Sequence, residues 1–383
     1  MEMNNYPCLL IVYTVLITAF MNNGCQIVRK QISLPSESLN IEPTSFQGDI
    51  IQLAWFHKPP DSGSLDILSN YFDVFILTNH DEVYRDKLRS LKRNSTIYQY
   101  LLLAEIQNPD SCSIHPFGNQ VANQPGDFCR ISQEHPDWFL LDQDGNYIMD
   151  ERYYFMDPGN PGYRQFWLQR AQQVQEEMGW YATYLDNAEA SLGKLKRMGV
   201  KPLKYPDDAS YQAAVEGFLA YLYENYFQIT QRPVIANIIE VTDNYIWFRY
   251  MQHLDGAMIE AFAVDWQDGY MSSASWNDQL ELISHTLDIG KSLILVAQGT
   301  KYDSDREKFS FASYLLVNNG CASFRYSNDE YYGEPWLYDD YLIDIGFPLG
   351  PRFQEGKNWR RDFTNGNVIV DAENHTASIN ITR

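Results

Sequence analysis

Short apolar runs rich in Val, Ile, Tyr and Phe alternate with amphipathic stretches along most of the chain after residue 47. Such runs predict buried strands, because β-branched and aromatic side chains pack well in a covered sheet. Eight strands are expected, over residues 50–56, 72–77, 97–104, 180–185, 234–239, 256–262, 292–297 and 321–326. Helices are expected over residues 81–92, 161–178, 211–230, 244–253, 276–289 and 305–318.

This alternation predicts the fold class. Apolar strands separated by helices imply a parallel sheet covered on both faces, and eight such units imply a closed (β/α)8 barrel, the TIM-barrel fold, over residues 48–346. An open, doubly wound sheet is the alternative. It is disfavoured by the strand count and because no Gly-x-Gly-x-x-Gly sequence follows the first strand.

Two segments depart from the alternation. Residues 107–159 are rich in Pro, Gly, Asn, Asp and aromatics without a clear helix, so we expect a long insertion after the third strand, over the C-terminal mouth of the barrel. Residues 347–383 form a C-terminal β extension, in which two short strands are expected.

The N-terminus has the pattern of an export signal. A continuous apolar stretch over residues 8–21 precedes Gly24 and Cys25, so residues 1–24 are expected to be a signal peptide and residues 25–47 a linker. Gly24 and Cys25 resemble the end of a bacterial lipobox, in which the Cys carries a lipid anchor; plain cleavage near Gly24 is the alternative. The protein is therefore expected outside the cytoplasm, either extracellular, periplasmic or lipid-anchored at the cell surface.

Composition narrows the classes of partner. The net charge is −21, from 29 Lys and Arg against 50 Asp and Glu, which disfavours nucleic acid and anionic membrane surfaces and favours a neutral or cationic substrate. The 27 Tyr, 20 Phe and 9 Trp suit a sugar-binding cleft, because sugar rings stack on aromatic planes. Neither the Cys nor the His spacing indicates a metal site, and no cofactor is expected. Cys112 and Cys129 are expected to form a disulfide.

Carboxylates at predicted strand ends are the candidate catalytic groups, because barrel enzymes place reacting side chains there. Glycoside hydrolysis needs one protonated and one ionised carboxyl group. Asp186 ends the fourth apolar run, and Glu260 lies among apolar neighbours that would keep it protonated, so these two are the predicted catalytic pair. Glu240 is the alternative second carboxylate, with helix capping as its structural interpretation.

Other side chains near the strand ends are candidate substrate-binding groups. Asn187, Gln298 and Arg325 would bond sugar hydroxyls, unless they bond one another at the barrel mouth. The aromatic candidates for stacking on sugars are Trp55, Tyr100, Tyr184, Trp266 and Tyr326, although strand alternation directs only some of them inward.

Several segments together resemble one known family. They are residues 51–60 (IQLAWFHKPP), 72–78 (FDVFILT) and 184–188 (YLDNA), followed by the late segments 359–363 (WRRDF) and 365–370 (NGNVIV). They resemble hypothetical glycosyl hydrolase family 15, and the resemblance spans residues 47–370. It implies a (β/α)8 glycosidase fold and the general reaction class, and it carries over the positions of Asp186 and Glu260.

The sequence thus predicts an exported hydrolase that cleaves O-glycosidic bonds of a polysaccharide or oligosaccharide with a carboxylate pair. A catalytically inactive carbohydrate-binding barrel is the alternative, and the separation of the two carboxyl groups distinguishes them. An aldolase or metal hydrolase is disfavoured, because no strand-end Lys pattern or metal-ligand cluster occurs.

Overall fold

The computed structural model describes residues 50–56, 65–266, 269–328 and 332–382. The predicted signal peptide, the linker and the possible lipid-anchor position Cys25 lie outside the described residues. Within those ranges, no helix is long and apolar enough to cross a lipid bilayer.

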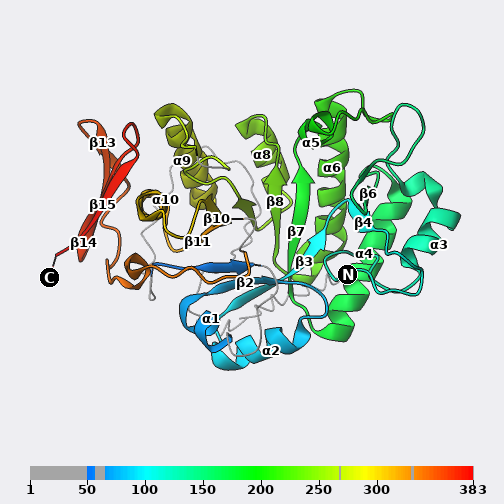
Figure 1. The fold of residues 1–383 in the computed structure, drawn as a ribbon, viewed down its shortest axis with the longest axis horizontal. Helices are drawn as coiled ribbons and strands as arrows, with labels where there is room; N and C mark the ends of the chain where they lie inside the picture. Colours follow the sequence, from blue (N-terminus) through cyan, green and yellow to red (C-terminus); the bar gives the residue numbers. More distant parts are fainter. Residues whose placement is uncertain (1–49, 57–64, 267–268, 329–331, 383) are drawn as a thin grey trace, which may run out of the picture.

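The main sheet of the described chain has eight strands, all parallel, in the order β1-β2-β3-β7-β8-β9-β10-β11 (Figure 1). It closes through a parallel bridge between Leu53 and Phe324, where the Phe324 amide donates to the Gln52 carbonyl at 2.9 Å. The predicted barrel is therefore confirmed. The strands are β1 (Ala54–Phe56), β2 (Val74–Leu77), β3 (Thr96–Leu102), β7 (Ala182–Glu189), β8 (Val234–Ile239), β9 (Gly256–Ile259), β10 (Ser292–Gln298) and β11 (Ala322–Ser327).

Helices connect these strands, and side-chain caps fix where several of them begin. Asn160 accepts hydrogen bonds from the amides of Gly162 and Tyr163 at the start of α4 (Pro161–Met178). In the same way Asp207, Asp243 and Asp303 cap α6 (Asp208–Leu222), α8 (Asn244–Met251) and α10 (Ser304–Val317). The helices are α1 (Leu65–Tyr71), α2 (Glu82–Leu91), α4 (Pro161–Met178), α5 (Gly193–Arg197), α6 (Asp208–Leu222) with η3 (Tyr223–Phe227) and α7 (Gln228–Thr230), α8 (Asn244–Met251), α9 (Ser273–Asp288) and α10 (Ser304–Val317).

Strand alternation divides the core into two layers. One apolar cluster fills the barrel interior with side chains such as Phe56, Tyr184 and Met258, whereas a larger cluster, which includes Leu185, lies between the strands and the helices. Because successive side chains of a strand point to opposite faces, Asp186 lies on the same face of β7 as Tyr184. The alternation therefore places the Asp186 carboxyl group at the inner face of the barrel.

The insertion after β3 is an ordered small subdomain. It contains β4 (Glu105–Gln107), β5 (Met149–Asp150) and β6 (Tyr153–Phe155) in a sheet of order β4-β6-β5, together with η2 (Pro136–Trp138). It also contains α3 (Asp127–Glu134), which corrects the expectation of no clear helix before Pro161; the helix follows Pro125 and Gly126 in a stretch whose composition is typical of loops. The expected Cys112–Cys129 disulfide is present and joins a loop of the insertion to α3.

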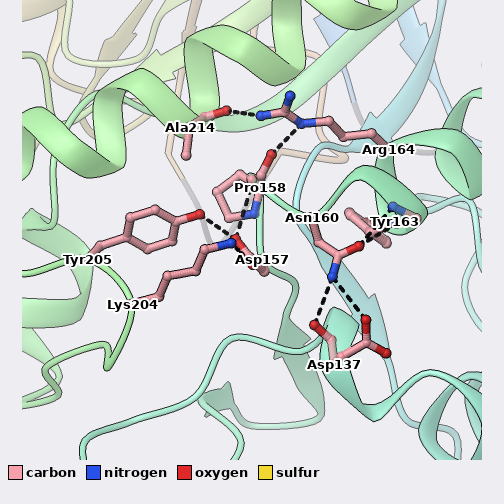
Figure 2. Close-up of polar contacts among 11 residues, drawn as sticks. Asp137, Asp157, Pro158, Asn160, Tyr163, Arg164, Lys204, Tyr205 and Ala214 are labelled. Atoms are coloured by element: carbon pink, nitrogen blue, oxygen red, sulfur yellow. Dashed lines mark hydrogen bonds and ion pairs between the residues drawn. The ribbon is translucent and has the colours of Figure 1, made fainter.

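The end of the insertion is fixed by polar contacts with the segment that precedes α6 (Figure 2). The buried Asp157 carboxylate accepts hydrogen bonds from the Lys204 ammonium, at 2.5 Å, and from the Tyr205 hydroxyl. Arg164 donates to the carbonyls of Pro158 at 2.7 Å and Ala214 at 2.8 Å. These contacts hold the entry of α4 against α6, and so they fix the insertion relative to the barrel.

The C-terminal extension forms a separate antiparallel sheet at one end of the molecule (Figure 1). In the described chain it has four strands, β12 (Phe353–Glu355), β13 (Asn358–Phe363), β14 (Gly366–Asp371) and β15 (Thr376–Ile381), where the sequence predicted two. The two additional strands are β12, which has only 3 residues, and β13, whose sequence NWRRDF is largely polar. The sheet packs against α10.

Candidate active site

Asp186 lies at an irregular point of β7. The register between β7 and β8 shifts between Leu185 and Ala188, and Asn187 has a left-handed backbone with φ 56°. A residue other than Gly in this region is strained, and such strain is concentrated at functional sites. The irregularity therefore begins immediately after Leu185 and includes Asp186.

Three donors hold the Asp186 carboxyl group. The Tyr100 hydroxyl donates to Oδ2, the Tyr184 hydroxyl donates to Oδ1 at 3.2 Å, and the Asn237 amide donates to Oδ1 at 3.0 Å. Burial, and then the Asp186 charge, raises the pKa of both tyrosines well above the usual value. Their phenol groups therefore remain protonated and serve as donors to Asp186.

Glu260 follows β9 and shares a donor with Asp186. The Asn237 side-chain nitrogen donates to Glu260 Oε2 at 2.9 Å as well as to Asp186 Oδ1 at 3.0 Å, so the two carboxyl oxygens are separated by no more than about 6 Å. Burial, followed by the charge of Asp186, raises the pKa of Glu260 to about 7, while the bond from Asn237 acts in the opposite direction. The structure thus brings the two predicted carboxyl groups together in different environments.

A third carboxyl group, Glu105, lies beside Asp186 at the start of β4. Its Oε1 accepts hydrogen bonds from Asn187 Nδ2 and from Lys194 Nζ, both at 2.9 Å. Burial raises the pKa of Glu105, and the Lys194 charge opposes this effect. Asn187 was predicted to bind substrate, but its side-chain amide donates a hydrogen bond to Glu105. This hydrogen bond supports the strained backbone after Asp186.

Glu240, the alternative second carboxylate, is engaged elsewhere. Its Oε1 forms an ion pair with Arg197 at 2.6 Å, and Asp243 rather than Glu240 caps α8. In the described part of the chain, the Asn237 side chain donates hydrogen bonds to Asp186 and Glu260, and none to Glu240. The geometry therefore favours Glu260 as the partner of Asp186.

Gln298 and Arg325 are buried near the mouth and bond protein groups. Gln298 Nε2 donates to the Glu260 carbonyl and to the Tyr332 hydroxyl, each at 3.3 Å. Arg325 donates to the carbonyls of Tyr332 at 2.9 Å and Glu334 at 3.0 Å, and burial lowers its pKa to about 10. Both residues therefore hold the segment after β11 beside the site.

Trp55 and Tyr326 were predicted to stack on substrate, and the structure corrects this. Both belong to the core between strands and helices, with exposures of 0 % and 1 %. Trp55 packs against Phe72, and Tyr326 packs against Trp336. The alternation of β1 and β11 turns both rings away from the barrel interior, so they stabilise the fold instead.

Tyr100 and Tyr184 do lie inside the barrel, where they bond Asp186 through their hydroxyls. Asn237 and Lys194 had no predicted role. The role of Asn237 could have been suspected from the sequence, since it is a polar residue inside the apolar run of β8. It lies two positions after Ile235, whose side chain points into the barrel, so its own side chain points inward as well. In the described part of the chain, no group of three or more His, Cys, Asp or Glu side chains is arranged to hold a metal ion.

Comparisons with known proteins agree with this fold. The chain is similar to the glycoside hydrolase domain of PelA from Pseudomonas aeruginosa, with TM-score 0.51 and 13 % identity over 76 % of this chain and 98 % of that one. It is also similar to the noncanonic maltogenic α-amylase AmyB from Thermotoga neapolitana, with TM-score 0.51 and 12 % identity over 84 % and 86 % of the two chains. The trehalose-6-phosphate hydrolase TreA from Bacillus licheniformis gives TM-score 0.52 and 11 % identity over 84 % and 90 %. At these identities the likeness concerns the fold.

No curated protein sequence matches the chain. The profile of hypothetical glycosyl hydrolase family 15 matches residues 89–367, which include Asp186, Asn237 and Glu260. This match covers most of the 383 residues and confirms the resemblance noted in the sequence. The family and the fold together support a glycoside hydrolase. The chain belongs to hypothetical glycosyl hydrolase family 15.

Proposed function

We propose that the protein is an exported glycosidase that hydrolyses O-glycosidic bonds of a polysaccharide or oligosaccharide with Asp186 and Glu260. The observation that carries the proposal is the single amide nitrogen of Asn237, which donates to both carboxyl groups. Two carboxyl groups from different strands therefore meet at the barrel mouth, where barrel enzymes perform their chemistry.

Glu260 is the proposed general acid. Its pKa of about 7 keeps a large fraction of the carboxyl group protonated near neutral pH, so it can protonate the oxygen of the leaving sugar. Glu105 is less suited to this role, because its carboxylate accepts hydrogen bonds from both Lys194 and Asn187. Glu240 is likewise bound to a cation, Arg197.

Asp186 is the proposed nucleophile. Retaining glycosidases place their carboxyl groups roughly 5 to 5.5 Å apart, and inverting enzymes roughly 6.5 to 9.5 Å apart. The shared donor limits the nearest oxygens of Asp186 and Glu260 to about 6 Å, which favours retention. Asp186 would then form a glycosyl ester as Glu260 protonates the leaving oxygen, and Glu260 would deprotonate the water that hydrolyses the ester.

The substrate is proposed to be a neutral or cationic glycan, because the chain carries a net charge of −21. Export is proposed from the apolar pattern of residues 1–24, with a lipid anchor at Cys25 as one mode of retention at the cell surface. The Cys112–Cys129 disulfide supports export, since disulfides persist mainly in oxidising compartments.

The test is a screen against a panel of neutral and cationic polysaccharides, with reducing ends as the readout. The parent protein, Asp186→Asn and Glu260→Gln are compared. Glu307→Gln is the matched control, because Glu307 is also buried with a raised pKa but lies on α10 beside Tyr341. We expect the parent and the control to release reducing ends, and the two site variants to lose at least about 100-fold in rate.

Equal activity of Asp186→Asn and the parent would refute the catalytic assignment. A folded parent that binds a glycan without cleaving it would instead support the catalytically inactive carbohydrate-binding protein.

A further inference from the structure

Asn237 makes contacts that packing alone does not explain. It is buried at 2 % exposure on β8, between Asp186 on β7 and Glu260 after β9. Its amide nitrogen has both protons directed at carboxyl oxygens, at 3.0 and 2.9 Å. Its carbonyl oxygen Oδ1 is buried and has no hydrogen-bond partner.

This orientation of the amide has an energetic cost. A buried carbonyl oxygen without a partner loses its hydration and gains nothing in return. The opposite orientation would direct Oδ1 at both carboxyl groups, and an oxygen acceptor facing an ionised carboxylate is repelled. The nitrogen therefore faces the carboxyl groups because they require a donor, and the oxygen is left unpaired as a result.

We propose that Asn237 is a positioning residue that places one neutral donor between Asp186 and Glu260, so that the two carboxyl groups neither touch nor share a proton. Two carboxyl groups in direct contact share one proton and titrate as a pair. A donor between them keeps the proton of Glu260 from being shared with Asp186. Glu260 then acts as the acid and Asp186 as the nucleophile. This catalytic part of the inference rests on the proposed glycosidase function. The predicted titration of Glu260 does not depend on that function.

The other titratable groups near Glu260 do not replace this donor. They are Asp186 and Tyr184 on β7 and Tyr100 on β3. Both tyrosine hydroxyls donate hydrogen bonds to Asp186 and have strongly raised pKa values, so they remain neutral at the pH values over which Glu260 titrates. Among these contacts, the bond from Asn237 is the one that favours the ionised form of Glu260.

The test measures the titration of Glu260 directly, by carbon NMR of protein labelled at the glutamate side-chain carboxyl. Glu260→Gln identifies the signal of Glu260 by its loss. In Asn237→Ala we expect the midpoint to rise by about one pH unit, because a hydrogen bond to the charged form is lost. Asn237→Asp has nearly the same shape and should raise the midpoint further, since it introduces a negative charge beside Glu260.

Asn318→Ala is the matched control. Asn318 is fully buried and its amide nitrogen also makes two hydrogen bonds, to the Ile50 carbonyl at 2.5 Å and the Tyr314 hydroxyl at 2.7 Å, but away from the carboxyl pair. This control should lower stability without moving the Glu260 midpoint. If Asn237→Ala does not fold, Asn237→Leu takes its place, because leucine has nearly the shape of asparagine and carries no donor.

Activity gives a second readout where a cleaved glycan has been found. The alkaline limb of the kcat/KM profile should move to higher pH with the NMR midpoint, and kcat should fall about 100-fold with little change in KM. A Glu260 midpoint that is the same in folded Asn237 variants and in the parent would overturn the proposal. If the parent cleaves no glycan, the glycosidase proposal fails, and the NMR titration still decides the role of Asn237.

Discussion

Glu260 should make the folded protein less stable at alkaline pH. Its pKa is raised from 4.5 to about 7 by burial and by the charge of Asp186. The folded state therefore holds the proton at pH values where the unfolded chain has released it, and stability falls as pH rises from about 4.5 through 7. At 1.36 kcal/mol per pH unit, the full effect is about 3 kcal/mol, and it is complete above pH 7.

Glu260→Gln removes this ionisation. The glutamine introduces its own unpaired polar hydrogens at a cost of about 1 to 3 kcal/mol, but this cost does not depend on pH. The informative quantity is therefore the change with pH of the difference in unfolding free energy between variant and parent. From about pH 5 to about pH 8.5 we expect this difference to shift by about 2 to 3 kcal/mol in favour of the variant.

Urea unfolding followed by tryptophan fluorescence at the two pH values measures this shift. Glu373→Gln is the control, since the Glu373 side chain is exposed at the turn between β14 and β15. The reasoning is refuted if the difference in unfolding free energy between Glu260→Gln and the parent stays constant within about 0.5 kcal/mol across this pH range. In that case the fold does not hold Glu260 in its protonated form.

Three further predictions follow from the site and the insertion. The first sugar released should keep the anomeric configuration of the substrate, as seen by proton NMR during hydrolysis; inversion would contradict the short carboxyl separation. Tyr100→Phe should lower kcat about 10- to 100-fold, because one hydrogen bond to Asp186 is lost, and should change the unfolding free energy by no more than about 1.5 kcal/mol. An unchanged kcat would show that Tyr100 does not position Asp186. Replacing Cys112 and Cys129 together by Ser should cost about 3 kcal/mol of unfolding free energy, because the bond closes a loop of 17 residues; the same stability in reduced and oxidised parent would contradict this.

The barrel was predictable because its strands are apolar and its helices carry capping signals. The run that became β8 was predicted to the residue. The helix α3 was missed because it lies in a stretch rich in Pro, Gly and Asn, and α5 was missed because 5 residues are too short for a clear period. The end of β9 was placed too late, since its apolar neighbours continue past Glu260 although the strand pairing ends at Ile259.

The proximity of the two carboxyl groups was predictable, because position along a strand decides which end of the barrel a side chain reaches. Asp186 and Glu260 were identified because carboxyl groups at strand ends meet at the mouth of a barrel. The sequence could not show that Asn237 bridges them, because the contact joins side chains 51 and 23 residues apart. Trp55 was misassigned because the direction of a short first strand depends on its register with its neighbours.

The C-terminal sheet makes the last part of the chain necessary to the barrel wall. Most side chains of α10 are buried, because the barrel covers one face of the helix and the sheet covers the other. Arg361 of β13 also donates to the carbonyls of Leu315 and Asn318, which end that helix. During synthesis, therefore, α10 stays partly uncovered until β15 has left the ribosome, and the wall beside β10 and β11 is completed only then.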